Sequence, residues 1–266
     1  MEVTNGLPFF SDFELDDSLQ WQMSRSEKYC MINLLHTLKP DHAIEIGTYQ
    51  GGSTQVISKF SKQVTTIDIS DSPQKLLEDK FDNVSFVVNE SHKVLNELFK
   101  SIEEKGDQLN FVLVDGDHTR LGVSRDLQAV LDYPHQNDVV VVLHDSFNPD
   151  CRKGMREIDY SKYPQVSYVE LDYVCGSFWT NDSYREMWGG LALVKIDGLK
   201  NGKRTKTAPV YQSYQKEFET CRAHSVHPVK DNLRFLIPLK KAVLKKLGRR
   251  HRTDRYYDFD TDHNAK

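Results

Sequence analysis

Acidic residues and histidines occur together in two short segments, each of which directly follows an apolar run. The first segment holds Asp115, Asp117 and His118, and the second holds His144 and Asp145. Open α/β sheets bind their ligands at the carboxyl ends of the strands, so we expect both segments at one edge of a sheet. Carboxylates and a histidine grouped in this way could hold a divalent cation, with Asp115, His144 and Asp145 as its ligands. The alternative is that Asp115 and Asp117 cap the following helix, while His144 is a hydrogen-bonded histidine at a strand end.

A glycine-containing turn lies upstream, between an apolar run that ends at Ile46 and a helical segment. Gly47, Gly51 and Gly52 allow a ligand to approach the backbone closely, and the next helix offers its N-terminus to polar groups. Asp68 ends the following apolar run, about 20 residues further on, where a carboxylate can hold a ribose diol. The pattern therefore predicts a nucleotide-containing cofactor.

Three interpretations of this turn stay open. NAD is disfavoured because the glycines at 47, 51 and 52 do not have the G-x-G-x-x-G spacing. Glu45, two residues before the first glycine, is also unusual for a dinucleotide site. A carboxylate there fits a position near the amino-acid portion of S-adenosylmethionine. The third interpretation is a glycine turn that binds no ligand.

The segment 45–53, Glu-Ile-Gly-Thr-Tyr-Gln-Gly-Gly-Ser, resembles the first motif of class I methyltransferases. More narrowly, it is similar to the group of catechol O-methyltransferase and macrocin-type sugar O-methyltransferases, and the resemblance covers about residues 30–195. It implies S-adenosylmethionine as the cofactor, with Asp68 on the ribose hydroxyls and residues 89–91 near the adenine. The cofactor-binding residues expected on this basis are Glu45, Gly47, Tyr49, Gly51, Ser53, Asp68, Ser91 and Asp115.

The same resemblance assigns roles to the acidic segments. Asp115 matches the first metal aspartate of the catechol-type enzymes, and His144 with Asp145 matches their second acidic pair. His118 falls where those enzymes carry a catalytic lysine. A histidine at 144 in place of an oxygen ligand weakens the case for magnesium and leaves manganese or another metal open. We expect Asp115 and His118 to be catalytic, with His118 as the base for a hydroxyl whose pKa the cation lowers.

Alternating strands and helices must position these residues. Near-continuous apolar runs are typical of parallel strands covered on both faces. Helical segments near 54–60 and 123–131 separate some of these runs, as in βαβ units. The expected strands are 43–46, 64–69, 84–88, 111–114, 139–143, 166–171 and 190–196. They predict a doubly wound, mostly parallel seven-stranded sheet (the Rossmann-like methyltransferase fold) with an antiparallel closing strand and a C-terminal extension.

The domain organisation follows from the same pass along the chain. Residues 1–40 form a helical lead-in that Pro40 ends, and residues 41–200 form the cofactor-binding domain. Residues 201–266 are a polar extension with a short basic helix at 239–247. That helix could contact an anionic membrane surface, although a solvated terminal helix packed on its own domain is the favoured interpretation.

The composition of the chain indicates where in the cell the protein works and which partners it is expected to bind. The chain has 266 residues, 38% hydrophobic and 28% charged, as in an ordinary globular protein, and its net charge of −4 argues against general nucleic-acid binding. The N-terminus lacks a signal-peptide pattern, no apolar run reaches about 18 residues, and the four cysteines form no CxxC pair. We therefore expect a cytoplasmic protein, and the resemblance permits a homodimer.

The acceptor is expected to be a small molecule or a glycoside. Aromatic residues are frequent between 159 and 188, where inserts of this fold commonly shape the acceptor pocket. Ordinary packing accounts for many of them. The favoured function is a metal-assisted O-methyltransferase for a hydroxyl of a sugar or natural product, a biosynthetic enzyme that uses magnesium or manganese. A metal-independent methyltransferase, a non-catalytic cofactor-binding subunit and an NAD-dependent oxidoreductase are the alternatives.

Overall fold

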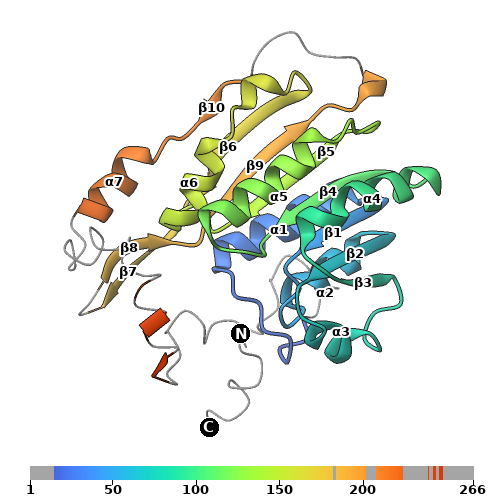
Figure 1. The fold of residues 1–266 in the computed structure, drawn as a ribbon, viewed down its shortest axis with the longest axis horizontal. Helices are drawn as coiled ribbons and strands as arrows, with labels where there is room; N and C mark the ends of the chain where they lie inside the picture. Colours follow the sequence, from blue (N-terminus) through green and yellow to red (C-terminus); the bar gives the residue numbers. More distant parts are fainter. Residues whose placement is uncertain are drawn as a thin grey trace, which may run out of the picture. The chain divides into compact units, whose positions relative to one another are not determined.

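The structure is a computed structural model that describes residues 15–181, 184–201 and 208–223, and the separate positions 239, 242–243 and 246–247. Strands and helices alternate along most of the chain (Figure 1). The helices are α1 (Arg25–Leu38), α2 (Gly52–Phe60), α3 (Ser72–Leu77), α4 (Ser91–Glu104), α5 (Arg120–Asp132), α6 (Pro149–Glu157) and α7 (Gln215–Ala223), with the 3₁₀ turns η1 (Tyr160–Lys162) and η2 (Leu199–Asn201). The strands are β1 (His42–Ile46), β2 (Gln63–Asp68), β3 (Val84–Val88), β4 (Leu109–Val114), β5 (Val139–His144), β6 (Val166–Val174), β7 (Ser177–Asn181), β8 (Tyr184–Trp188), β9 (Leu191–Ile196) and β10 (Val210–Tyr211).

The main sheet has the strand order β10-β6-β9-β5-β4-β1-β2-β3. Strand β9 runs antiparallel to β5 and β6, and every other neighbouring pair is parallel. The predicted doubly wound sheet with one antiparallel closing strand is therefore confirmed. The predicted count of seven strands was one short, because the edge strand β10 has only two residues, both exposed, and no apolar alternation marks it.

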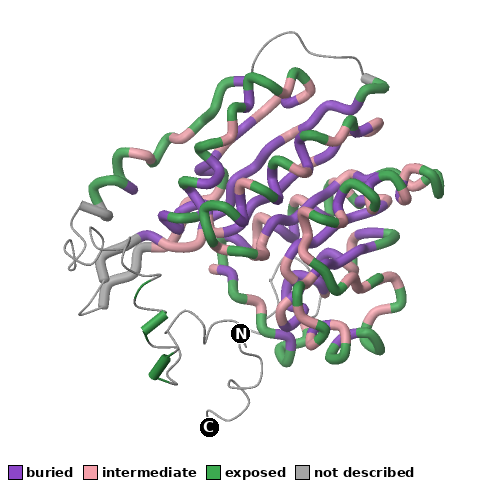
Figure 2. The backbone as a smooth tube through the Cα atoms, viewed as in Figure 1, coloured by how far each residue is buried: buried purple, intermediate pink, exposed green. Residues whose placement is uncertain are grey.

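Two hydrophobic clusters cover the two faces of this sheet. Helices α4, α5 and α6 contribute to one cluster, and α1 and α2 contribute to the other. Neighbouring residues of one strand belong to different clusters, as Val112 and Leu113 of β4 do, because successive side chains point to opposite faces. Figure 2 shows the central strands as the most buried part of the fold. Strand β1, buried along its whole length, lies between β2 and β4.

The order of connections creates the place where a ligand can bind. From β1 the chain continues to β2 and β3 on one side, and it then returns to β4 and β5 on the other. The loops after β1 and β4 therefore diverge at the carboxyl ends of adjacent strands. Such a switch point is where open α/β sheets bind their ligands.

Helix α1 precedes the sheet and begins with a capping box. The Ser24 side chain accepts a hydrogen bond from the Glu27 backbone, and the Glu27 carboxylate accepts one from the backbone N–H of Ser24. Lys39, in the left-handed conformation at φ +44°, ends the helix just before Pro40. The predicted helical lead-in therefore contains a well-delimited helix, which starts with a reciprocal cap.

The chain divides into two compact units, residues 1–178 with 187–218 and residues 179–186 with 219–266. Strands β7 and β8 pair with each other as a separate two-stranded sheet. Most of the predicted basic helix lies outside the described residues, and its described positions Leu239, Val243 and Leu247 are exposed. Within the described part of the chain, no helix combines the length and the apolar character needed to span a membrane.

Candidate active site

The turn after β1 is built around backbone conformations that favour glycine. Gly47 and Gly51 have φ values of +94° and +80°. A Cβ atom at Gly47 would lie 2.2 Å from the backbone oxygen of Asp115, so only glycine lets the β1 turn approach the end of β4 this closely. Tyr49 adopts φ +49° in the same turn. The turn predicted to bind the cofactor therefore directly contacts the backbone of the first acidic segment.

Asp68 holds this turn from the end of β2. Its Oδ2 accepts hydrogen bonds from the backbone N–H groups of Thr48 at 3.1 Å and Tyr49 at 3.2 Å. Its Oδ1 accepts one from the backbone of Ser70 at 2.9 Å. The side chain predicted to bind ribose thus lies at the switch point and is fixed by the glycine turn.

Glu45 occupies the middle of the buried strand β1 and is fully buried. The hydroxyls of Ser53 and Thr54 each donate to its carboxylate at 2.6 Å, and the Thr66 hydroxyl donates at 2.8 Å. Burial raises its pKa to about 7, although these three hydrogen bonds favour the ionised form. Through these hydrogen bonds Glu45 connects the start of α2 to strands β1 and β2.

Ser91 is the first residue of α4, next to the end of β3. Its hydroxyl donates to a carboxylate oxygen of Asp126 on α5. Asp126 is only 3% exposed, and burial raises the pKa of its carboxyl to about 6. Asn89 accepts a hydrogen bond from the backbone of Glu90, whose side chain pairs with a lysine on the exposed side of α4. Residues 89–91 are the segment predicted to lie near the adenine. Within the described structure, Ser91 is the residue of this segment that has a buried acidic partner.

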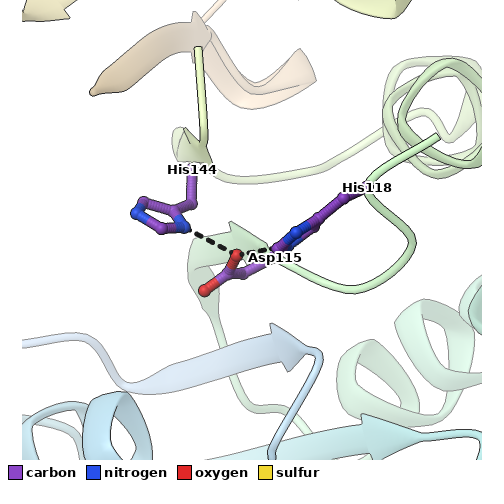
Figure 3. A group of neighbouring side chains, drawn as sticks. All are labelled: Asp115, His118 and His144. Carbon is purple, nitrogen blue, oxygen red and sulfur yellow. Dashed lines mark hydrogen bonds and ion pairs between the residues drawn. The ribbon is translucent and has the colours of Figure 1, made fainter. Parts of the chain in front are cut away.

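Asp115, His118 and His144 come together at the carboxyl ends of β4 and β5 (Figure 3). Oδ1 of Asp115 lies 2.8 Å from Nδ1 of His144 and 3.1 Å from Nε2 of His118. One ligand atom from each residue lies within 4.8 Å of the other two, as a shared cation requires. The sequence prediction that these segments meet at one edge is therefore correct for these three residues.

Asp145 and Asp117 lie differently. Oδ2 of Asp145 is 3.3 Å from Nδ1 of His118, on the ring nitrogen that faces away from Asp115. The group of three possible cation ligands therefore contains His118 where the sequence prediction had Asp145. Asp117 accepts hydrogen bonds from the backbone and the hydroxyl of Thr119, which is the N-cap residue of α5. Asp117 thus supports the start of that helix.

The charges of the cluster are strongly coupled. Burial alone would raise the pKa of Asp115, but His144 and His118 outweigh it and lower that pKa to about 2. Burial would lower the pKa values of both histidines, and the neighbouring carboxylates raise them instead, well above the usual value for His144. The cluster therefore favours protonated imidazole rings beside an ionised Asp115.

Glu27 completes the cluster and was missed by sequence reasoning. Its Oε1 lies 3.4 Å from Nε2 of His144, and it also accepts a hydrogen bond from the backbone of Gly190. The side chain is 2% exposed, and the pKa of its carboxyl is lowered because contacts with His144 and Ser24 outweigh its burial. The S-x-x-E pattern at 24–27 indicates a helix start, but nothing in it points to a partner 163 residues away.

The aromatic residues expected near the acceptor are only partly described. Tyr160 is buried and donates to the Met155 carbonyl, and Tyr163 donates to Asp132, so these two serve packing. Tyr173 is 37% exposed on β6. The side chains of residues 178–186 lie outside the described set, and so the acceptor pocket stays a prediction.

Residues 44–146 match a family model described as a methyltransferase domain. This range contains the glycine turn, Asp68, Ser91 and all three residues of the Asp115 cluster. The strand order, the switch point and the family match agree with one another. Over residues 44–146 the chain is therefore similar to methyltransferase domains.

Other comparisons are weaker. No curated protein matches the sequence. An O-methyltransferase from Bacillus cereus in complex with S-adenosylhomocysteine is 15% identical over 68% of this chain and 86% of that chain, with a TM-score of 0.46. The O-methyltransferase TomG from Streptomyces achromogenes, with S-adenosylmethionine bound, is 15% identical over 68% and 82%, with a TM-score of 0.47. The N-methyltransferase NodS from Bradyrhizobium japonicum is 12% identical over 69% and 94%, with a TM-score of 0.47.

Proposed function

We propose that the protein is an S-adenosylmethionine-dependent O-methyltransferase that uses a divalent cation, manganese or magnesium, and acts on a hydroxyl of a sugar or natural product. The observation that carries this proposal is the contact between the cofactor turn and the Asp115 cluster. Gly47 packs on the backbone of Asp115, while the side chain of Asp115 faces two imidazoles. A methyl donor bound at the turn would thus have proton-accepting groups beside it.

The donor set fits a cation. Asp115 offers a carboxylate oxygen, and His144 and His118 offer nitrogens within 4.8 Å, a mixture that suits manganese better than magnesium. Asp145 remains a candidate ligand that would have to displace His118 from its carboxylate. A cation held here would lower the pKa of an acceptor hydroxyl and orient it.

His118 is the candidate base when Asp115 and His144 hold the cation without it, because a ring nitrogen bound to the cation could not accept a proton. Asp145 faces its Nδ1, so Nε2 is the atom that would accept the hydroxyl proton. The acceptor oxygen would then bond to the methyl carbon as the carbon–sulfur bond breaks, leaving S-adenosylhomocysteine. In the arrangement shown, Asp115 and Asp145 raise the pKa of His118 and so favour its protonated form. Neutralisation of Asp115 would free Nε2, which favours the cation-assisted reaction over one that relies on His118 alone.

Calorimetric titration of S-adenosylhomocysteine into the protein, with and without manganese or magnesium, tests the proposal. We expect Asp68→Ala to weaken binding at least about tenfold, because the carboxylate fixes the turn and is predicted to hold the ribose. Asp71→Ala, an exposed acid just beyond this strand, is the matched control. If S-adenosylhomocysteine does not bind under any condition, the methyltransferase function is excluded. The oxidoreductase and the non-catalytic protein then become the favoured alternatives.

A second experiment separates the two methyltransferase alternatives. Methyl transfer from labelled cofactor to a panel of sugar and aromatic hydroxyl compounds is measured before and after chelation. Activity that survives chelation would select the metal-independent reaction. Cofactor binding without turnover on any hydroxyl acceptor would select the non-catalytic subunit.

A further inference from the structure

We propose, resting on the cation-assisted function above, that Glu27 is a positioning residue that holds His144 with Nδ1 toward the cation and Nε2–H toward its own carboxylate. In metal sites, a ligating histidine usually donates its other ring N–H to a carboxylate or a carbonyl group. That partner fixes the tautomer and the orientation of the ring. Nothing in the methyltransferase domain match covers this residue, because the match begins at residue 44.

His144 lies between two carboxylates that come from different parts of the chain. Its Nδ1 is 2.8 Å from Asp115, and its Nε2 is 3.4 Å from Oε1 of Glu27. The ring is 8% exposed, and its buried Nε2 makes no hydrogen bond of good geometry within the described structure. The nearest acidic group to this nitrogen is therefore Glu27, slightly beyond hydrogen-bond distance.

Glu27 is itself held in place on two sides. Its carboxylate accepts hydrogen bonds from the backbone N–H groups of Ser24 and Gly190. Gly189 and Gly190 both have positive φ values, and a Cβ at Gly189 would lie 2.8 Å from Oε1 of Glu27. The turn before β9 therefore closes over the carboxylate and leaves it little freedom to move away from His144.

The contact with Glu27 determines which nitrogen of His144 carries the proton. A neutral imidazole carries one proton, and either nitrogen can hold it. A carboxylate ligand at position 144 would need no such control, whereas a histidine ligates only through its unprotonated nitrogen. With a cation bound between Nδ1 and Asp115, Glu27 beside Nε2 would keep the proton on Nε2 and leave the lone pair of Nδ1 for the cation.

The test measures metal affinity directly, without turnover. Manganese binding to the wild-type chain and to the variants Glu27→Gln and Glu27→Ala is titrated by electron paramagnetic resonance. We expect a loss of about 10- to 100-fold in affinity for the two variants, the range typical when such an outer partner is removed. Glu104→Gln is the matched control, because it makes the same substitution at an exposed acid in the last turn of α4. It should leave manganese affinity unchanged.

Long-range ¹H–¹⁵N spectra of the zinc-loaded wild type supply a second measurement that does not depend on the variants folding. We expect His144 with a proton on Nε2 and none on Nδ1. Unchanged manganese affinity in both Glu27 variants, or a proton on Nδ1 in the loaded protein, would overturn the role of Glu27 alone. A wild type that binds S-adenosylhomocysteine but no metal would overturn this role and the cation-assisted mechanism, while the methyltransferase assignment would stand.

Discussion

Glu45 on β1 and Thr66 on β2 lie directly opposite each other in the parallel sheet, and the threonine hydroxyl donates to the glutamate carboxylate at 2.8 Å. Ser53 and Thr54 donate to the same carboxylate from the first turn of α2. This buried acid has three hydroxyl partners and no cation among them. It links the first turn of α2 to strands β1 and β2, and its burial makes the carboxylate difficult to ionise.

Replacing Glu45 with Gln should change how stability depends on pH. The folded-state pKa is about 7 and the ordinary value is 4.5, so the folded chain binds more protons than the unfolded chain between these limits. The free energy of unfolding therefore falls as pH rises through this window and levels off above it. We expect Glu45→Gln to gain on the order of 3 kcal/mol relative to wild type between pH 4.5 and pH 8. Urea unfolding across this range measures the difference, and a constant difference would contradict the assigned burial effect.

Gly47→Ala should destabilise the fold more than a matched glycine substitution. Both Gly47 and Gly106 have positive φ, but a Cβ at Gly106 would meet nothing within 4 Å. Gly106→Ala therefore reports backbone strain alone, about 1 kcal/mol. Gly47→Ala adds a clash with the Asp115 backbone, worth a further 1–3 kcal/mol or so. Chemical denaturation compares the two variants, and equal losses would show that the turn does not pack on β4 as described.

The buried ion pair between Arg152 and Asp172 should be expensive to break. Nη1 of Arg152 lies 2.7 Å from Asp172, and both side chains are almost inaccessible to solvent. Asp172 also accepts a hydrogen bond from the backbone of Tyr214, which fixes the segment after β10. We expect Arg152→Met to cost about 3–5 kcal/mol, because Asp172 is left buried without its cation. Denaturant unfolding tests this, and adding Asp172→Leu should recover part of the loss.

An exposed pair is the control for this experiment. Lys62 and Asp41 form an ion pair in which the lysine side chain is 78% exposed. Lys62→Met should leave the midpoint of unfolding unchanged, because solvent screens such pairs. If Arg152→Met shifts the midpoint of unfolding as little as Lys62→Met does, the Arg152 pair is not buried as described.

Ser91→Ala should destabilise the contact between α4 and α5. It removes the hydroxyl that donates to the buried carboxylate of Asp126. The loss of a partner for such a group costs about 1–3 kcal/mol. Ser124→Ala on α5 is the control, because among the described residues its hydroxyl donates to the Leu121 carbonyl of its own helix, and its effect should stay within about 0.5 kcal/mol. Thermal unfolding separates the two, and a double variant with Asp126→Leu should lose less than Ser91→Ala alone.

The sheet could be predicted because its strands are strong local signals. The run 139–143 is apolar at every position, and in the structure it is covered on both faces. Strand β10 gives no such signal, since two exposed residues acquire strand geometry only by pairing with β6. Strands β7 and β8 were likewise not predicted, because the aromatic residues there indicate a pocket as readily as a hairpin.

The site could be predicted as far as strand ends determine it. Asp115 follows β4 and His144 is the last residue of β5, so parallel pairing of the two strands brings them together. The placement of Asp145 could not be predicted, because it depends on a left-handed backbone at φ +59° that turns the chain after β5. Glu27 could not be predicted either, since its contact with His144 depends on how α1 packs against the sheet.

The contact of Glu27 with Gly190 also has a consequence for biosynthesis. The two residues are 163 positions apart, and β9 enters the sheet between β5 and β6, both of which precede it in the chain. Translation delivers α1 before any strand of the sheet and β9 only after β1 to β8, so the acidic residue leaves the ribosome long before its partner. A ribosome that stalls before β9 would therefore release a nascent chain that contains every residue of the glycine turn and of the Asp115 cluster, yet has no closed site.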